Sequence, residues 1–167
     1  MTGDPCAKDK NGDTNCLKRL RQDLETESTD SMMLLNNLEE NPICSVTCDE
    51  RFSCTFVVWK QYATQTQLRF IHESILLLMK KHRINKILGD DTALPMIYGE
   101  DQNWIIEDWM PRALAAGLKA VANKKPTAHW GNVAVSGVQS RLPGSLTWRS
   151  FNDLDEARSW LQNASLS

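Results

Sequence analysis

The chain has 167 residues, of which 41% are hydrophobic and 24% are charged. This composition is typical of an ordinary globular domain and excludes collagen, a disulfide-based mini-protein and a wholly disordered chain. The longest uninterrupted apolar run, Ile75 to Met79, is far shorter than the roughly 20 residues that a membrane span needs. No secretion-signal pattern precedes it, so we expect a cytoplasmic protein without a membrane span.

The net charge of −2 is unevenly distributed along the chain. Residues 1–50 carry 5 basic and 11 acidic side chains, whereas residues 51–167 carry 14 and 10. Proteins that bind nucleic acids usually concentrate a stronger basic excess on one face. The basic cluster from Lys80 to Arg83 instead suits the C-terminal end of a helix, where the helix dipole favours cations. We therefore expect no nucleic-acid partner.

Residues 1–33 form a polar stretch that is poor in large apolar side chains, and we expect it to be a flexible N-terminal extension. Residues 34–167 are then a single domain. The five cysteines are an odd number in a chain without an export signal, which favours free thiols over a disulfide framework. Cys44 and Cys48 match one half of a zinc pattern, but alternation also places them on the buried face of a strand. We expect structural cysteines, no metal and no cofactor.

The first elements of the domain are predicted to be a β-hairpin followed by a long helix. Residues 43–48 and 54–59 are rich in β-branched and aromatic side chains and are joined by a short polar turn. From Thr64 onward, apolar residues recur at spacings of three and four through Leu78. Thr64 or Thr66 is expected to cap this helix, and the basic cluster to close it.

The remaining elements alternate between strand and helix. Residues 84–89 form a short apolar strand that ends in a polar loop containing Pro95. A helix follows from Asp101, is interrupted or restarted at Pro111, and ends at Gly117. Residues 118–122 form a strand, residues 130–138 a weaker helix and residues 146–151 a final strand. Asp153 and Glu156 are spaced as a capping box at the start of the last helix.

These elements give the order ββαβαβαβα and predict an α/β fold. We expect a mixed sheet of four to five strands, parallel inside with an antiparallel edge, flanked by helices. No internal repeat is visible in the sequence.

In the stretches 56–59, 87–90, 100–113 and 116–119, and in the final capped helix, the sequence resembles the SpoIIAA-like branch of the STAS superfamily, also described as STAS/SEC14-like in bacterial proteins. The resemblance spans about residues 40–164. Its most distinctive part is the run Glu100 to Ala113, which contains the pattern Trp-x₄-Trp-x-Pro, followed by the Ala-Gly-Leu-Lys segment at 116–119. It also includes Phe56 to Trp59, Ile87 to Asp90 and the final capped helix.

The resemblance implies a regulatory or adaptor domain that acts through protein contacts in signalling, without catalysis, and that frequently forms a homodimer. In the anti-sigma-factor antagonists of this superfamily, a phosphorylated Ser follows the third strand at the start of a helix, where free N–H groups favour a phosphate. The sequence here reads Asp90-Asp91-Thr92, so Thr92 is the nearest equivalent of that phospho-switch. A polar loop with Asx-type turns is the alternative interpretation.

The sequence contains no constellation that indicates an enzyme. There is no Gly-x-Ser-x-Gly elbow, no Gly-x-Gly-x-x-Gly segment and no Walker loop. His72 lies beside the apolar face of the first helix, His82 in its basic end and His129 beside Trp130. The paired carboxylates, such as Asp90-Asp91, suit caps and turns better than acid–base chemistry.

Trp104 and Trp109 are five residues apart, so a regular α-helix would place them about 140° apart, on different faces. One of them should then face something other than the sheet. Both tryptophans could be buried against different elements. Alternatively, Trp104, Trp109, Met110, His129 and Trp130 could line an apolar groove for a partner or for a small lipid-like ligand. The carrier or sensor of such a ligand is the alternative to the regulatory domain.

Overall fold

The computed structural model describes residue 38, residues 41–49 and residues 52–164. These residues form five strands, five α-helices and one π-helical segment that lies between two of the helices. In chain order the elements are β1 (Cys44–Asp49), β2 (Cys54–Trp59), α3 (Gln65–His82), β3 (Lys86–Asp90), α4 (Gly99–Trp104), η1 (Ile105–Trp109), α5 (Met110–Ala115), β4 (Ala120–Lys124), α6 (His129–Gln139), β5 (Thr147–Phe151) and α7 (Leu154–Asn163). The predicted order ββαβαβαβα is confirmed.

All five strands belong to one mixed sheet, with the strand order β1-β2-β3-β4-β5. β1 pairs with β2 antiparallel, as the short connection between them requires. The pairs β2–β3, β3–β4 and β4–β5 are parallel, and a helical crossover joins each pair. The predicted α/β fold with an antiparallel edge is therefore confirmed.

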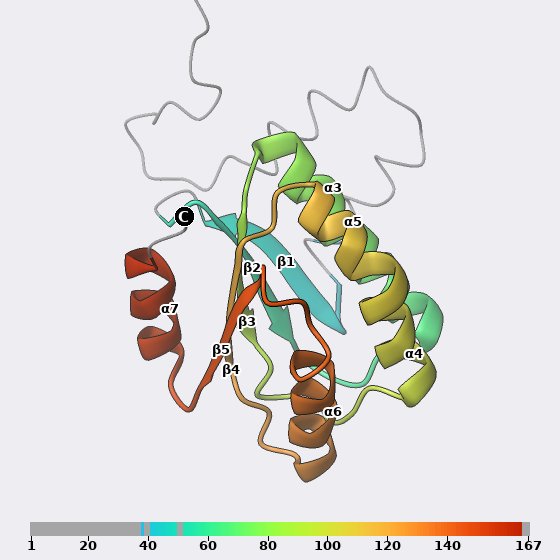
Figure 1. Ribbon diagram of the computed structural model, residues 1–167. Helices are drawn as coiled ribbons and strands as arrows, with labels where there is room; N and C mark the ends of the chain where they lie inside the picture. Colours follow the sequence, from blue (N-terminus) through green and yellow to red (C-terminus); the bar gives the residue numbers. More distant parts are fainter. Residues whose placement is uncertain (1–37, 39–40, 50–51, 165–167) are drawn as a thin grey trace, which may run out of the picture.

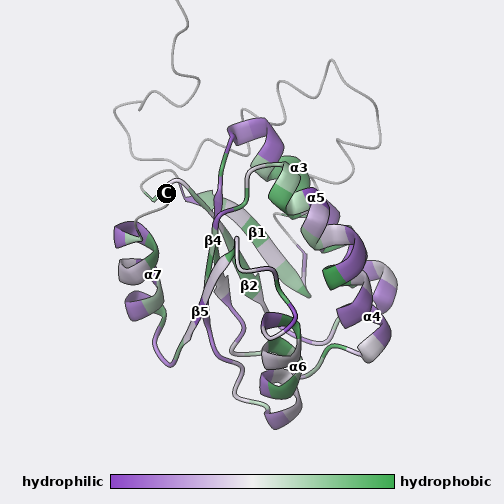
Figure 2. Ribbon diagram, viewed as in Figure 1, coloured by the Kyte–Doolittle hydropathy of each residue, from purple (hydrophilic) through white to green (hydrophobic). Residues whose placement is uncertain are grey.

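The helices cover the two faces of the sheet unequally. Figure 1 shows α7 alone on one face, while α3, α4, α5 and α6 lie on the other. Strand alternation divides neighbouring residues between these two layers: Ile87 and Val121 belong to the larger core, whereas Leu88 and Ala122 belong to the small core under α7. Figure 2 shows hydrophobic residues along the strands and mixed hydropathy along the helices, as expected for helices with one buried face.

The helix ends follow the capping chemistry that the sequence predicts. The Thr64 side chain accepts a hydrogen bond from the Gln67 N–H, and the Gln67 side chain accepts one from the Thr64 N–H, which completes a capping box at α3. At the start of α7, Asp153 accepts from the N–H groups of Asp155 and Glu156, but the Glu156 side chain does not complete the predicted capping box. Gly117, with φ +104°, follows α5 as the expected terminator.

The helix predicted from Asp101 is not interrupted at Pro111. Helical structure runs without a break from residue 99 to residue 115, but η1 inserts a π-turn before the proline, with the Met110 N–H bonded to the Ile105 carbonyl. A proline in a helix donates no N–H and presses on the carbonyl four residues earlier. We attribute the wider turn to this conflict, because η1 contains Glu107, the residue whose carbonyl Pro111 would meet.

The expected extension at residues 1–33 lies outside the described residues, as do Cys6 and Cys16. Within the described part of the chain, no helix is both long and apolar enough to cross a membrane.

Candidate functional site

The structure contains a cavity of about 100 Å³ between the sheet and the helices of its larger layer, here called the central cavity. Most of its lining is aliphatic. The apolar residues are Val57, Ile75, Ile87, Leu94, Ile97, Ile105, Met110, Val121, Val135 and Val138, with the tryptophans Trp59, Trp109 and Trp148. Three residues with polar side chains, His72, Asp91 and Asn123, complete the lining with Gly89.

The position of the cavity follows from the sheet register. Val57 pairs with Gly89, Gly89 with Asn123, and Asn123 with Ser150, so these residues form one row across β2, β3, β4 and β5. This row lies near the carboxyl ends of the parallel strands, the edge at which α/β sheets bind ligands. At Gly89 an added Cβ would lie 3.2 Å from Asp91 Oδ1 and 3.3 Å from Asn123 Cβ. Glycine therefore leaves room beside the carboxylate.

A buried polar network spans this row. Asn123 donates from Nδ2 to Asp91 Oδ2 over 2.7 Å. The Asn123 Oδ1 accepts from the indole N–H of Trp148 at 2.9 Å and from the hydroxyl of Ser150 at 2.7 Å. Gln139 of α6 extends the network by donating to the Trp148 carbonyl. Asn123 thus uses its acceptor fully and holds one carboxylate oxygen of Asp91 in place.

Asp91 itself is 7% exposed, and its burial raises the pKa of the carboxyl to about 7, despite the opposing hydrogen bond from Asn123. The nearby Asp90 carboxylate also raises this pKa. Among the described residues, no donor lies within hydrogen-bond distance of Asp91 Oδ1, and no Lys or Arg lines the central cavity. The site therefore holds an acidic group whose charge the described chain does not balance.

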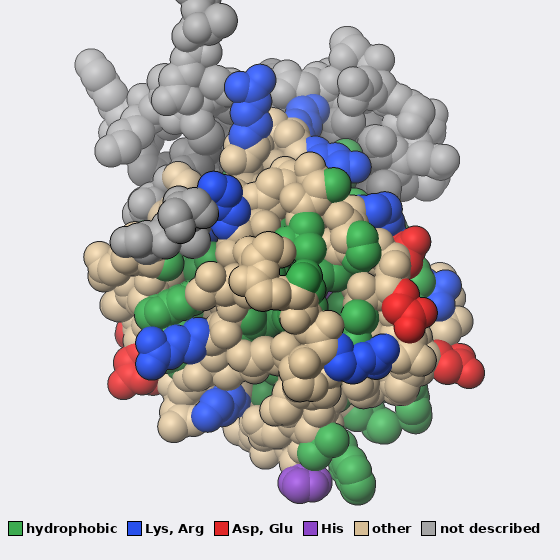
Figure 3. All heavy atoms as spheres, viewed as in Figure 1, with side chains coloured by type: hydrophobic (Ala, Val, Ile, Leu, Met, Phe, Trp, Pro, Cys, Tyr) green, Lys and Arg blue, Asp and Glu red, His purple; other side chains and the backbone are tan. Residues whose placement is uncertain are grey.

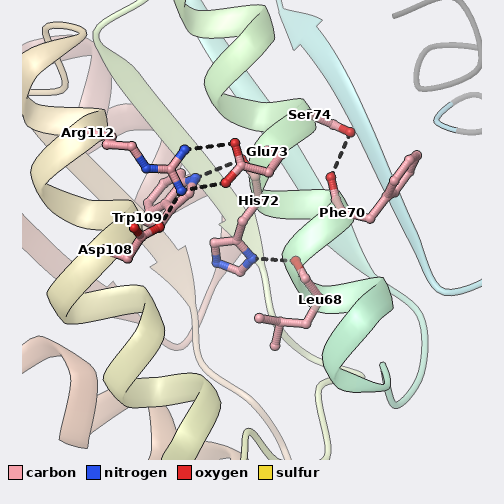
Figure 4. A network of polar contacts seen from close by, with 8 residues as sticks. All are labelled: Leu68, Phe70, His72, Glu73, Ser74, Asp108, Trp109 and Arg112. Atoms are coloured by element: carbon pink, nitrogen blue, oxygen red, sulfur yellow. Dashed lines mark hydrogen bonds and ion pairs between the residues drawn. The ribbon is translucent and has the colours of Figure 1, made fainter. Parts of the chain in front are cut away.

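His72 of α3 lines the cavity and packs against three tryptophans, of which Trp59 and Trp109 also line it. Its ring centroid lies 6.3 Å from that of Trp59, 5.9 Å from Trp104 and 4.9 Å from Trp109. Its Nδ1 lies 2.9 Å from the Leu68 carbonyl oxygen, as Figure 4 shows. Although solvent still reaches part of the residue, desolvation of the enclosed ring lowers the pKa of His72 to about 4. The imidazole is therefore neutral at pH 7.

Trp104 and Trp109 differ from the expectation that they lie on separate faces. Both rings contact His72 edge-on, at interplanar angles of 84° and 89°. The 140° separation holds for a regular α-helix, whereas a π-turn bonds residue i to residue i+5 and brings such a pair toward one side. Trp109 lines the central cavity, whereas Trp104 packs against His72 and Arg69 of α3 and does not line it.

An exposed ion-pair cluster joins α3 to the end of this helical stretch. Arg112 donates to both oxygens of Glu73, with Nη1 at 2.8 Å from Oε2, and also pairs with Asp108 (Figure 4). These carboxylates raise the pKa of the Arg112 guanidinium above its already high value. The three side chains are 39–53% exposed, so the cluster fixes geometry more than it stabilises the fold.

The five residues expected to form a groove are not brought together. Trp109 and Met110 are buried and line the central cavity, and Trp104 is half-buried beside His72. His129 and Trp130 begin α6, and neither lines the cavity. Trp130 is 67% exposed, and Figure 3 shows a histidine beside hydrophobic side chains standing out from the end of the molecule below α6.

The expected phospho-switch segment forms a turn rather than a helix start. The Asp90 carboxylate accepts from both the N–H and the hydroxyl of Thr92, in an Asx-type turn. The next helix, α4, begins only at Gly99. Thr92 therefore lacks the helix N-terminus that the resemblance to STAS domains implies for a phosphate-binding position. Asp91 of the same segment lines the central cavity.

Cys44, Cys48 and Cys54 are buried, and none of them forms a disulfide with another described cysteine. Burial raises the pKa of both the Cys44 and the Cys54 thiol to about 12, so neither is a nucleophile at neutral pH. Within the described ranges, no group of three or more His, Cys, Asp or Glu side chains is arranged to hold a metal ion.

Asn123, Trp148 and His72 were not among the predicted site residues. One signal was present in the sequence: an asparagine directly after Ala120-Val121-Ala122 is a polar residue in a strand that is otherwise apolar on both faces. The predicted strand ended at Ala122, one residue too early to reveal it. The sheet register that brings Asn123 close to Asp91 could not be predicted from the residues that surround either position in the sequence.

Comparison of the chain with family models, with curated proteins and with solved structures gives no match.

Proposed function

We propose that this protein binds a small, mostly apolar ligand in the central cavity and acts as a carrier or sensor of that ligand. The observation that carries the proposal is a cavity of about 100 Å³ with aliphatic and tryptophan walls and a single buried carboxylate. A mostly apolar space with a few converging polar groups is the usual form of a small-molecule site.

The size of the cavity limits the ligand or the part of it that enters. A cavity of roughly 150 Å³ lined by aliphatic and aromatic side chains can hold benzene. By the same scale, about four to five non-hydrogen atoms fit into 100 Å³. A larger ligand would place only its end group here.

The chemistry of the described residues favours binding over catalysis. The His72 imidazole is neutral, its Nδ1 faces a main-chain carbonyl, and the buried thiols are protonated. Asp91 is the one carboxylate lining the cavity, and no nucleophile or oxyanion donor pair lines it beside that group. We therefore propose a non-catalytic role in the cytoplasm.

The experiment is a pair of intact-mass measurements, first under native and then under denaturing conditions. A bound ligand gives an extra mass that disappears on denaturation. Val135→Phe on α6 should fill the cavity and remove that mass, whereas Val133→Phe should keep it, because Val133 lies on the same helix and is 49% exposed. Extra mass of the same size in both variants would contradict the proposal.

A second candidate is the STAS-like regulatory or adaptor domain that the sequence resembles, working through protein contacts or as a homodimer. The observation that favours it is the exposed Trp130, which lies three residues from the exposed Val133 on α6. Light scattering after gel filtration would test the homodimer. Trp130→Ala should then shift the protein to the monomer. A monomeric wild type would contradict the homodimer and leave contact with a different protein as the remaining form of this candidate.

A further inference from the structure

We infer that the ligand group held in the central cavity is a small tertiary or quaternary ammonium, seated between the tryptophan rings and the free Oδ1 of Asp91. This inference rests on the proposed function, because it names the chemical class of the ligand that the cavity binds. Three properties of the site carry it: an unbalanced carboxylate, aromatic walls and few free acceptors.

The first property is charge. Asp91 contacts Asn123 on β4 and shares the lining of the cavity with the neutral His72 on α3 and the aliphatic Val135 and Val138 on α6. Its neighbour Asp90 adds a second negative charge, and no described Lys or Arg lines the cavity. A buried carboxylate is costly unless a cation or hydrogen-bond donors balance it. A cationic ligand would provide that balance, and an anionic one would be repelled.

The second property is the aromatic wall. Trp59, Trp109 and Trp148 all line the cavity, and hydrogen bonds hold two of them, Trp109 and Trp148, in position. The Trp148 indole donates to Asn123 and the Trp109 indole donates to the His72 carbonyl, so each N–H is already occupied. What these rings offer a ligand is π-surface, which attracts cations and is the recurring partner of alkylated ammonium groups.

The third property is the number of acceptors. Asp91 Oδ2 is bonded to Asn123, and Asn123 Oδ1 already accepts from Trp148 and Ser150. Among the described polar lining groups, Oδ1 of Asp91 and Nε2 of the neutral His72 therefore remain the side-chain acceptors without a partner. A primary ammonium has three N–H donors and would leave at least one of them unpaired. A tertiary or quaternary ammonium has one donor or none, and its four to five heavy atoms match the space.

The test is a set of NMR titrations of the full chain at pH 8 with three probes. Tetramethylammonium and tert-butanol each have five heavy atoms, so they compare a cation with a neutral molecule of matched size. Methylammonium adds the primary amine. We expect tetramethylammonium to bind at least about tenfold more tightly than either other probe, which is within the range of a desolvated cation–π contact.

Asp91→Asn should abolish the preference for tetramethylammonium, and Asp155→Asn on α7 should retain it, because Asp155 lies in the helix on the opposite face of the sheet and its side chain is 87% exposed. The pH dependence of the wild type provides a second readout that needs no variant. Tetramethylammonium affinity should fall at least tenfold from pH 8 to pH 5, as Asp91 becomes protonated, while tert-butanol affinity should not change.

The outcomes separate the two proposals. Binding of tert-butanol as tight as that of tetramethylammonium would overturn the ammonium inference and leave the cavity as a site for neutral ligands. An unchanged preference in Asp91→Asn, or at pH 5, would overturn the role of Asp91. Saturable binding of none of the three probes would overturn both the inference and the proposed function.

Discussion

Trp109 donates its indole N–H to the main-chain carbonyl of His72 over 2.7 Å, and its ring packs edge-on against the imidazole of the same residue at 4.9 Å. This double contact fastens the π-turn of η1 to the middle of α3. Because Trp109 and His72 both line the central cavity, the contact also fixes one of its walls.

Trp109→Phe should therefore destabilise the protein by about 1–2 kcal/mol, because it removes a buried hydrogen bond and part of a packed ring. Trp130→Phe is the matched control, since Trp130 is 67% exposed and its replacement should change the free energy of unfolding by less than about 0.5 kcal/mol. Urea denaturation monitored by far-UV circular dichroism measures both. Equal losses would contradict the anchoring role of Trp109.

The stability of the Asp91→Asn variant, relative to that of the wild type, should increase as pH rises. The pKa of Asp91 is raised by burial to about 7, so the native state holds this proton more tightly than the unfolded chain does. Its stabilising contribution is present below the unfolded pKa of about 4 and is lost as pH rises through 7. From pH 4 to pH 8, the unfolding free energy of the variant minus that of the wild type should increase by at most about 4 kcal/mol. A difference independent of pH would show that Asp91 is not desolvated.

His72→Gln should show the opposite dependence. The pKa of His72 is lowered by burial to about 4, so the unfolded chain binds this proton first as pH falls. The wild type therefore loses stability from pH 6.5 down to pH 4, and the variant does not. The unfolding free energy of the variant minus that of the wild type should be larger at pH 4 than at pH 7 by up to about 3 kcal/mol. Denaturation curves at these two pH values measure this difference, with His82→Gln at the basic end of α3 as the control. The same pH dependence in both variants would contradict the prediction.

Gly131→Ala should destabilise the protein although alanine favours helices. A Cβ at Gly131 would lie 2.3 Å from the Leu94 carbonyl oxygen and 2.8 Å from Pro126 Cβ, so α6 must move away from the segment that carries Leu94. We expect a loss of about 1–3 kcal/mol. Gly144→Ala meets no atom within 4 Å and should be neutral within about 0.5 kcal/mol. Thermal unfolding of both variants compares them, and equal melting temperatures would contradict the close packing at Gly131.

The fold was predictable because local signals and the final structure agree at most elements. The spacing of apolar residues from Leu68 to Leu78 and the cap at Thr64 define α3 without help from tertiary contacts. Asp153 and Gly117 mark helix ends for reasons of hydrogen bonding and backbone conformation that hold in any context. Alternating helices and strands then restrict the sheet to a few topologies.

The candidate site was less predictable because its residues meet only through the sheet register. Asp91 and Asn123 are 32 positions apart, and neither is unusual in its local sequence apart from the polar asparagine in an apolar strand. The conformation of η1 is a second case. Pro111 indicates a disturbance, but periodicity alone did not tell a broken helix from a continuous one with a π-turn. That difference decides whether Trp104 and Trp109 share a face.

The most direct test of the central cavity as a ligand site is a crystal structure of the protein under xenon pressure. Xenon occupies apolar cavities of this kind without requiring hydrogen bonds. Our account predicts a xenon atom among Ile75, Trp109 and Val121, and none there in Val135→Phe. Wild-type crystals that diffract well and hold no xenon at this position, or side chains that close the space, would contradict the account.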